Sequence, residues 1–213
     1  MPRFFLLPLG LVVGLLGATP VVAQLPASEG NRPSPERRQS TSEADASILR
    51  TLAEYNIRQI ALAQLAMQLS TNSQLVGYAR QRLIEYSTLD RKLTELAQLR
   101  QLKLPRSART LSSTAREALL DIDSRLSDLR TPLFDQAYLD ALNSDDQALA
   151  ETLQPQLEKT EDAEIKTLAS QNLEKVKAQQ AKVAPVAKVI AAAVTAQNKA
   201  QQAAQKPAAK TPK

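Results

Sequence analysis

Residues 43–70 read EADASILRTLAEYNIRQIALAQLAMQLS and carry the clearest structural signal in the chain. Their apolar side chains recur every three or four residues, the period that gathers them on one face of an α-helix. The segment contains neither glycine nor proline, the residues that most often interrupt a helix. We therefore predict a helix over 43–70, with an inward stripe of Ile48, Leu52, Tyr55, Leu62, Leu65, Ala66 and Leu69.

Signals for helix starts divide the following residues into four further helices. Capping-box spacings at 71–74 and 114–117 predict the starts of a long second helix and a shorter third helix. Thr131 followed by Pro132 predicts the start of a fourth helix. Thr160, with acidic residues directly after it, predicts the cap of the last helix.

Prolines are expected to end or bend three of these helices. Pro105 should end the second, Pro155 should kink or shorten the fourth, and Pro185 should bend the last. Gly77 is the only glycine between residues 43 and 194, and no alternating strand pattern bounded by turn residues occurs there. A β-sheet is therefore not expected.

Four long helices with one apolar stripe each bury those stripes most economically in an antiparallel four-helix bundle. The first two helices are separated by only a few residues, so they must pack antiparallel. The connection over 104–130 is long enough to cross the bundle from end to end, and it holds the shorter extra helix. We therefore predict one all-α domain over 43–194.

The first 23 residues have the layout of a secretory signal peptide. Arg3 precedes an apolar run over 4–18, and Val21-x-Ala23 suits a signal peptidase, which predicts export with cleavage after Ala23. The alternative is an uncleaved membrane anchor, because 4–23 is roughly long enough to span a bilayer. Prolines and glycines within the run disfavour that alternative. After signal removal, no transmembrane span is expected.

Two polar segments flank the predicted bundle. Residues 24–42 are rich in Pro, Ser, Arg and Glu, so we predict a disordered linker. Residues 195–213 hold four lysines and no acid, and form an Ala/Lys/Gln/Pro-rich tail that we also predict to be disordered, although its Ala-rich start can extend the last helix. We expect the tail to contact an unknown envelope protein or an anionic envelope surface. The alternative is a solubilising end. Nucleic acid is not an expected partner, because the tail has no aromatic residues to stack on bases.

The chain contains no cysteine and no histidine, which excludes disulfides, thiolate catalysis and metal sites built on either residue. An enzyme would have to use carboxylates, lysine, serine or tyrosine. Asp145 and Asp146 are adjacent on a predicted helix and point about 100° apart, so we interpret them as a solvated face. The tyrosines are interpreted as core residues with polar tips at the bundle surface: Tyr55, Tyr78, Tyr86 and Tyr138.

Four segments together resemble a known bacterial envelope family: 53–66, VGYARQRLI over 76–84, Leu104-Pro105, and FDQAYL over 134–139. The chain is similar over about 48–189 to the family called domain of unknown function 4142. The resemblance implies a ferritin-like helical bundle in the periplasm or at the outer membrane. It implies no established biochemical role.

The family pattern usually carries a Glu in the first helix and a His in each of three others, and such positions could bind a metal as ferritin-like sites do. The matching positions in this chain are Gln59, Ser87, Asp146 and Gln179, and all four depart from the pattern. We therefore predict no metal site, no cofactor and no catalytic residue. The predicted role is an interaction or structural module rather than an enzyme.

The alternative function is a degenerate ferritin-like metal-binding protein or oxidase. In that hypothesis Glu85, Asp145 or Asp146 would keep some affinity for hard cations, because carboxylate oxygens are the ligands that such ions prefer.

Overall fold

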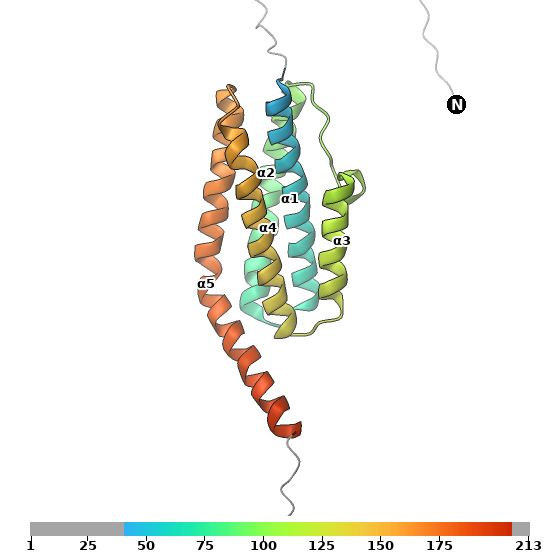
Figure 1. Ribbon diagram of the computed structural model, residues 1–213, viewed down its shortest axis with the longest axis vertical. Coiled ribbons are helices and arrows are strands. Elements are labelled where there is room, and N and C mark those ends of the chain that lie inside the picture. The colour runs from blue at the N-terminus through green and yellow to red at the C-terminus, as the bar shows by residue number, and fades with distance from the viewer. Residues whose placement is uncertain (1–40, 206–213) are drawn as a thin grey trace, which may run out of the picture. The chain divides into compact units, whose positions relative to one another are not determined.

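The computed structural model describes residues 41–205, which contain helices and turns but no β-strand. The long helices are α1 (Glu43–Leu69), α2 (Ser73–Leu99), α4 (Leu133–Leu157) and α5 (Ala163–Gln205), and the connection between α2 and α4 holds the 3-10 turn η1 (Ala108–Thr110) and α3 (Ser113–Ser127) (Figure 1). The all-α prediction is confirmed. The signal-peptide prediction for 1–23, most of the predicted linker and residues 206–213 lie outside the described part.

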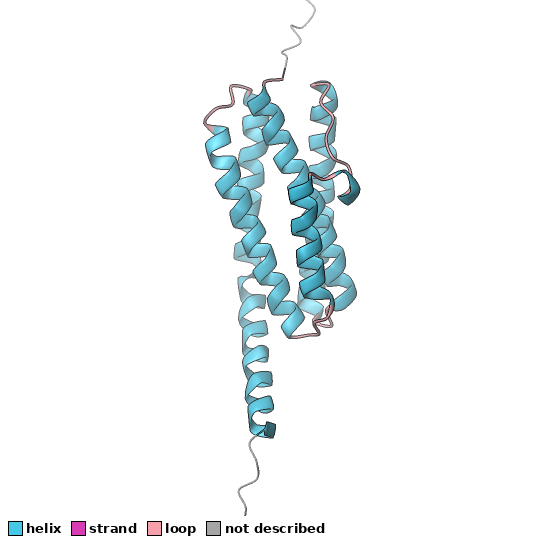
Figure 2. Ribbon diagram, turned by 45° about the vertical axis from the view of Figure 1, so that its right-hand side comes forward, coloured by secondary structure: helices cyan, strands magenta, loops and turns pink. Residues whose placement is uncertain are grey.

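The four long helices lie side by side as a bundle (Figures 1 and 2). α1 packs most extensively on α2 and then on α4, whereas α5 packs mainly on α4. The chain runs in opposite directions in α1 and α2, and again in α4 and α5, while the connection with α3 runs the length of the bundle beside α1 and α4. The predicted four-helix bundle, with a shorter helix in the long connection, is confirmed. Among the described helices, none is apolar over a length that could cross a membrane.

Two predicted helix caps are displaced by one or two residues. The Asn72 side chain, not Thr71, caps α2 by accepting hydrogen bonds from the amides of Gln74 and Leu75. Ser112, not Thr114, caps α3 by accepting from the amide of Ala115. Asn and Ser are strong caps, because a short side-chain oxygen reaches the free amides of the first turn.

The residues predicted to cap α4 and α5 have other roles. Thr131 makes no cap for α4; its hydroxyl accepts from the amide of Thr71 at 3.0 Å, which ties the α1–α2 turn to the start of α4. Thr160 is buried and donates to Asp45, so it joins the α4–α5 turn to the first turn of α1. The cap of α5 is Asp162, whose carboxylate accepts from two amides at 3.0 and 3.2 Å.

The prolines act largely as predicted. α2 ends at Leu99, before Pro105, and Pro155 lies in the last turn of α4, which ends at Leu157. Pro185 lies inside α5, which bends about midway along its length (Figure 1). α5 continues beyond the predicted domain end at 194 to Gln205, so the predicted disorder of the tail is wrong for residues 195–205. This part of α5 extends past the ends of the other helices (Figures 1 and 2).

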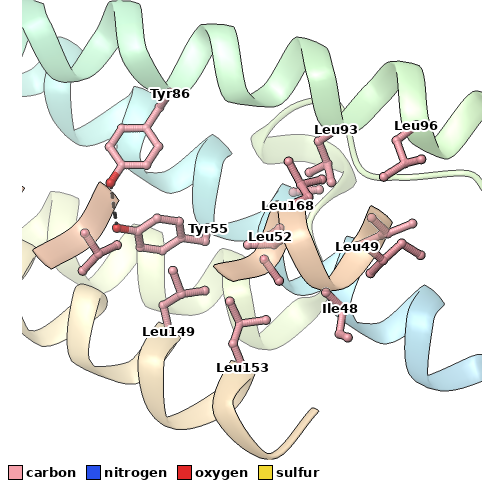
Figure 3. Close-up of a cluster of buried hydrophobic side chains, with 14 residues drawn as sticks. Ile48, Leu49, Leu52, Tyr55, Tyr86, Leu93, Leu96, Leu149, Leu153 and Leu168 are labelled. Atoms are coloured by element: carbon pink, nitrogen blue, oxygen red, sulfur yellow. Dashed lines mark hydrogen bonds between the residues drawn. The ribbon is translucent and has the colours of Figure 1, made fainter. Parts of the chain in front are cut away.

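Two large apolar clusters, placed at different heights, form the core of the four long helices, and a small third cluster joins Ile57 of α1 to Leu111 and Ala115. One cluster, part of which is drawn in Figure 3, joins Ile48–Tyr55 of α1 to Tyr86–Leu96, Leu149–Leu153 and Ile165–Val176. The other joins Leu62–Ala66 to Leu75–Ala79, Phe134–Leu142 and Ile190. In every long helix, the residues between the two clusters include buried polar side chains. The core is therefore divided by a polar layer.

Candidate functional site

Four nearly inaccessible polar side chains form the centre of this layer, one from each long helix: Gln59 of α1, Arg82 of α2, Asp146 of α4 and Gln179 of α5, none more than 2% exposed. We call these four residues and the tyrosines bonded to them the polar layer. Burying such groups is costly unless they are hydrogen-bonded and their charges are paired. The stability of the bundle therefore depends on how they are bonded.

The Arg82 guanidinium is the hub of the polar layer. Its Nη2 lies 3.3 Å from Asp146 Oδ1 and also donates to the side-chain oxygen of Gln59, while Nη1 donates to the Tyr78 hydroxyl at 3.0 Å. The guanidinium carbon also lies 4.9 Å from the centre of the Tyr86 ring, within range of a cation–π interaction. Arg82 thereby connects α2 with α1 and α4 at the level where the apolar clusters are interrupted.

Asp146 is bound from a second side by a pair of tyrosines. The Tyr55 hydroxyl donates to Asp146 Oδ1 at 2.5 Å, and the Tyr55 and Tyr86 hydroxyl oxygens lie 3.1 Å apart (Figure 3). Because the Tyr55 hydroxyl uses its only hydrogen in the bond to the carboxylate, the Tyr86 hydroxyl must be the donor to Tyr55. Burial raises the pKa of Asp146, while Arg82 and the Tyr55 hydrogen bond oppose that rise. Burial likewise raises the pKa of Tyr86 to about 12.

Asp145 belongs to a second ion pair at the edge of the layer. Its Oδ1 accepts from Arg58 Nε and Nη2 at 2.9 and 2.7 Å, and its Oδ2 accepts from Gln59 at 2.5 Å. Gln59 therefore bridges the two ion pairs, accepting from Arg82 and donating to Asp145. The predicted solvated face for Asp145 and Asp146 is wrong, because arginines on α1 and α2 compensate both carboxylates for burial.

Of the four positions that match the family's Glu and His positions, three lie in the polar layer and one does not. Gln59 and Asp146 belong to the network of Arg82, and Gln179 lies in the same layer with its amide donating to Glu85. Ser87 is exposed and is not part of the layer. Its neighbour Tyr86 is the residue of that turn that faces inward.

The prediction that the tyrosines are core residues is correct, but the predicted position of their hydroxyls at the bundle surface is wrong. All four tyrosines are buried, but the hydroxyls of Tyr55, Tyr78 and Tyr86 are bonded inside the layer rather than at the bundle surface. The Tyr138 hydroxyl is buried and has no partner within the described residues. Burial raises the pKa of Tyr138 as well.

Comparison with known proteins matches 30–186, which include the polar layer, to the family model described as Domain of unknown function (DUF4142). The chain belongs to this family. Neither the curated proteins nor the solved structures gave a match. The family assignment confirms the resemblance noted from the sequence.

The donor set of this family member does not fit a metal centre. Asp146 faces Arg82, Asp145 faces Arg58, and Glu85 lies 3.5 Å from Lys182. Across 41–205, no three acidic side chains converge as a metal site would require. A divalent cation placed between Gln59 and Asp146 would meet the guanidinium, and the two like charges would repel each other strongly in this buried setting.

Arg82 is the residue that reasoning from sequence missed. It lies three residues after Ala79 and four before Tyr86, so it occupies the inward stripe of α2. A charged side chain at a core position of an amphipathic helix is a signal for a buried partner of opposite charge. That signal predicts a buried acidic partner but does not say which acidic residue it is.

Proposed function

We propose that this family member is an exported, non-catalytic helical-bundle protein of the bacterial envelope, located in the periplasm or at the outer membrane. In this proposal it acts as an interaction or structural module. The observation that carries the proposal is the bonding of Arg82 to Asp146, Gln59 and Tyr78 at the centre of the bundle. Groups that could take part in chemistry are bonded to one another there, and they stabilise one arrangement of the helices.

The acid–base properties of Tyr86 and Arg82 support a non-catalytic role. General acids and bases work best when their pKa lies near the working pH. Burial raises the pKa of Tyr86 to about 12. Burial alone would lower the pKa of Arg82, but Tyr86, Tyr78 and Asp146 outweigh it and hold the pKa above its ordinary value. Neither group is therefore suited to exchange protons near neutral pH.

Metal dependence separates this proposal from the metal-binding alternative. The full chain should melt at the same temperature with added Fe²⁺, Mn²⁺ or Ca²⁺ and with EDTA, and purified protein should carry only substoichiometric metal. A chelator effect of several degrees would instead favour a metal site that includes Glu85, Asp145 or Asp146.

The part of α5 from residue 175 onward supports a role in surface contact. Residues 175–205 contain five lysines and no acidic residue, whereas the whole chain has a net charge of only +5. Lys188 and Lys199 are exposed and lie three helical turns apart, so they share one side of α5. We propose that this basic side contacts an anionic envelope surface, which agrees with the partner expected for the tail.

Sedimentation with vesicles of mixed neutral and anionic phospholipid tests that contact. Replacing both Lys188 and Lys199 by glutamine in the full chain should weaken binding by roughly 30-fold, since each lysine near an anionic membrane contributes about 1 kcal/mol. Replacing exposed Lys92 and Lys166 by glutamine provides the matched control. Equal binding by both double variants, or binding unaffected by salt, would refute the contact.

Export is tested on the protein recovered from the native envelope. Its N-terminal sequence is expected to begin at Gln24, directly after the proposed cleavage site, and the protein is expected in the periplasmic or outer-membrane fraction. Recovery of the unprocessed chain from the cytoplasmic fraction would contradict the proposal.

A further inference from the structure

We propose that a cavity between α4 and α5 binds a small organic amine, with the ammonium group of the ligand against Asp146 and its apolar body between the two helices. The cavity measures about 250 Å³ and reaches from the surface to Asp146 and Tyr78 of the polar layer. This binding site goes beyond the proposed function, and its failure would leave the non-catalytic role unaffected.

A buried carboxylate, that of Asp146, forms the floor of the cavity. Asp146 lines it although the residue is only 2% exposed. Both internal hydrogen bonds of this carboxylate, from Tyr55 and Arg82, end on Oδ1. Within residues 41–205 no hydrogen bond reaches Oδ2, so this oxygen is left for a donor inside the cavity. The network behind it holds the carboxylate in place, which avoids the entropy cost of ordering it when a ligand binds.

The charges around the cavity favour a cation. Two carboxylates line it, Asp146 at the floor and Asp140 near the mouth, and its lining includes no lysine or arginine. Arg82 compensates one negative charge from behind Asp146, which leaves one negative charge in excess. A ligand with a single positive charge would neutralise that excess, whereas an anion would be repelled.

The walls favour a ligand with an apolar body. Leu139 and Leu142 of α4 face Val183 and Ala187 of α5 across the cavity. At the mouth, the Gln180 amide donates to Asn143 at 3.5 Å and joins the two helices. An engineered cavity of about 150 Å³ holds benzene. A cavity of about 250 Å³ therefore has room for an aromatic ring with a short aminoalkyl arm.

Benzylamine and benzyl alcohol form the test pair, because they share shape and size while only the amine is charged at neutral pH. The full chain, labelled with ¹⁵N and ¹³C, is titrated with each compound and followed by NMR. Benzylamine should change the chemical shifts of Leu139, Val183 and Ala187 in a saturable way. It should also change the chemical shift of the carboxyl carbon of Asp146. It should bind at least about tenfold more tightly than benzyl alcohol, the gain expected for a hydrogen bond to a charged group.

Two variants locate the site on the protein. Ala187→Leu fills the cavity and should abolish saturable binding, whereas Ala178→Leu, on the same helix but lining a different groove, should leave it unchanged. Asp140→Asn removes a charge near the mouth and should weaken benzylamine binding but not benzyl alcohol binding. Circular dichroism confirms that each variant is folded.

The proposal is overturned if benzylamine shows no saturable binding, or if the amine and the alcohol bind equally. It is also overturned if folded Ala187→Leu binds benzylamine as well as the unmodified chain does.

Discussion

Replacing Arg82 by methionine is expected to lower the free energy of unfolding by about 3–5 kcal/mol, the usual result of removing one partner of a buried ion pair. The size of the loss follows from the position of the pair. Arg82 is fully buried and Asp146 is 2% exposed, so water cannot take over the role of the missing guanidinium. The Tyr78 hydroxyl and the Gln59 side-chain oxygen also lose a donor. For a domain of this size the midpoint of thermal unfolding should fall by roughly 6–20 °C.

A double-mutant cycle separates the ion pair from lost packing. Asp146→Leu alone should cost about as much as Arg82→Met, because it leaves the guanidinium without its counter-ion. The double variant leaves no unpaired charge at the position of this ion pair, so it should lose far less than the two single losses added together. Urea unfolding followed by circular dichroism at 222 nm gives all four free energies. Additive losses, or a loss below about 1 kcal/mol for Arg82→Met, would refute the reasoning.

The pH dependence of Arg82→Met provides an independent check. Arg82 lowers the pKa of Asp146 against the effect of burial, so removing it should raise this pKa further. A carboxyl whose pKa is higher in the folded state than in the unfolded state stabilises the fold below the unfolded pKa, and that contribution disappears as pH rises through the folded pKa. The difference in free energy of unfolding between Arg82→Met and the unmodified chain should therefore shrink as the solution is made more acidic. A deficit that grows on acidification would contradict this assignment.

Three further predictions concern other parts of the bundle. The four tyrosines all have raised pKa values, Tyr86 to about 12, so absorbance at 295 nm should show little tyrosinate at pH 10 in the folded protein. Their contribution to the free energy of unfolding should be fully present below the unfolded-state pKa of tyrosine and lost as pH rises above it. Ionisation of the tyrosines should therefore coincide with unfolding. Asp162→Ala should cost about 0.5–2 kcal/mol through loss of the α5 cap, whereas exposed Glu161→Ala should cost almost nothing by urea unfolding. Truncation after Val194 should reduce the helical signal at 222 nm without lowering the melting temperature, because the helix beyond this residue is almost wholly exposed.

The fold could be predicted from sequence because the apolar stripes repeat with the helical period. The stripe through Ile48, Leu52 and Tyr55 predicts the buried face of α1, since packing depends on which side of a helix each residue occupies. Periodicity does not fix the helix starts, because Thr, Asn, Ser and Asp cap comparably and often lie within a few residues of one another. The sequence 160–162 shows this ambiguity: Asp162 caps α5, while Thr160 bonds across the bundle to Asp45.

The polar layer could not be predicted, because its partners are far apart in the sequence. Arg82 and Asp146 are separated by 64 residues, and Tyr55 and Asp146 by 91. Helical periodicity shows that a residue points inward but does not give its height relative to residues of other helices. Sequence alone therefore predicts a solvated face for Asp146, although the arginine that compensates its burial is present on α2.

We expect a guanidinium, rather than a metal ion, to supply the positive charge at the centre of this bundle. A crystal structure of the full chain, grown with Mn²⁺ and recorded with anomalous scattering, tests it most directly. Arg82 is expected to lie between Gln59 and Asp146, with no anomalous peak in the polar layer. An anomalous peak bound by Asp146 together with Glu85 or Asp145, with Arg82 turned away from the centre, would contradict it.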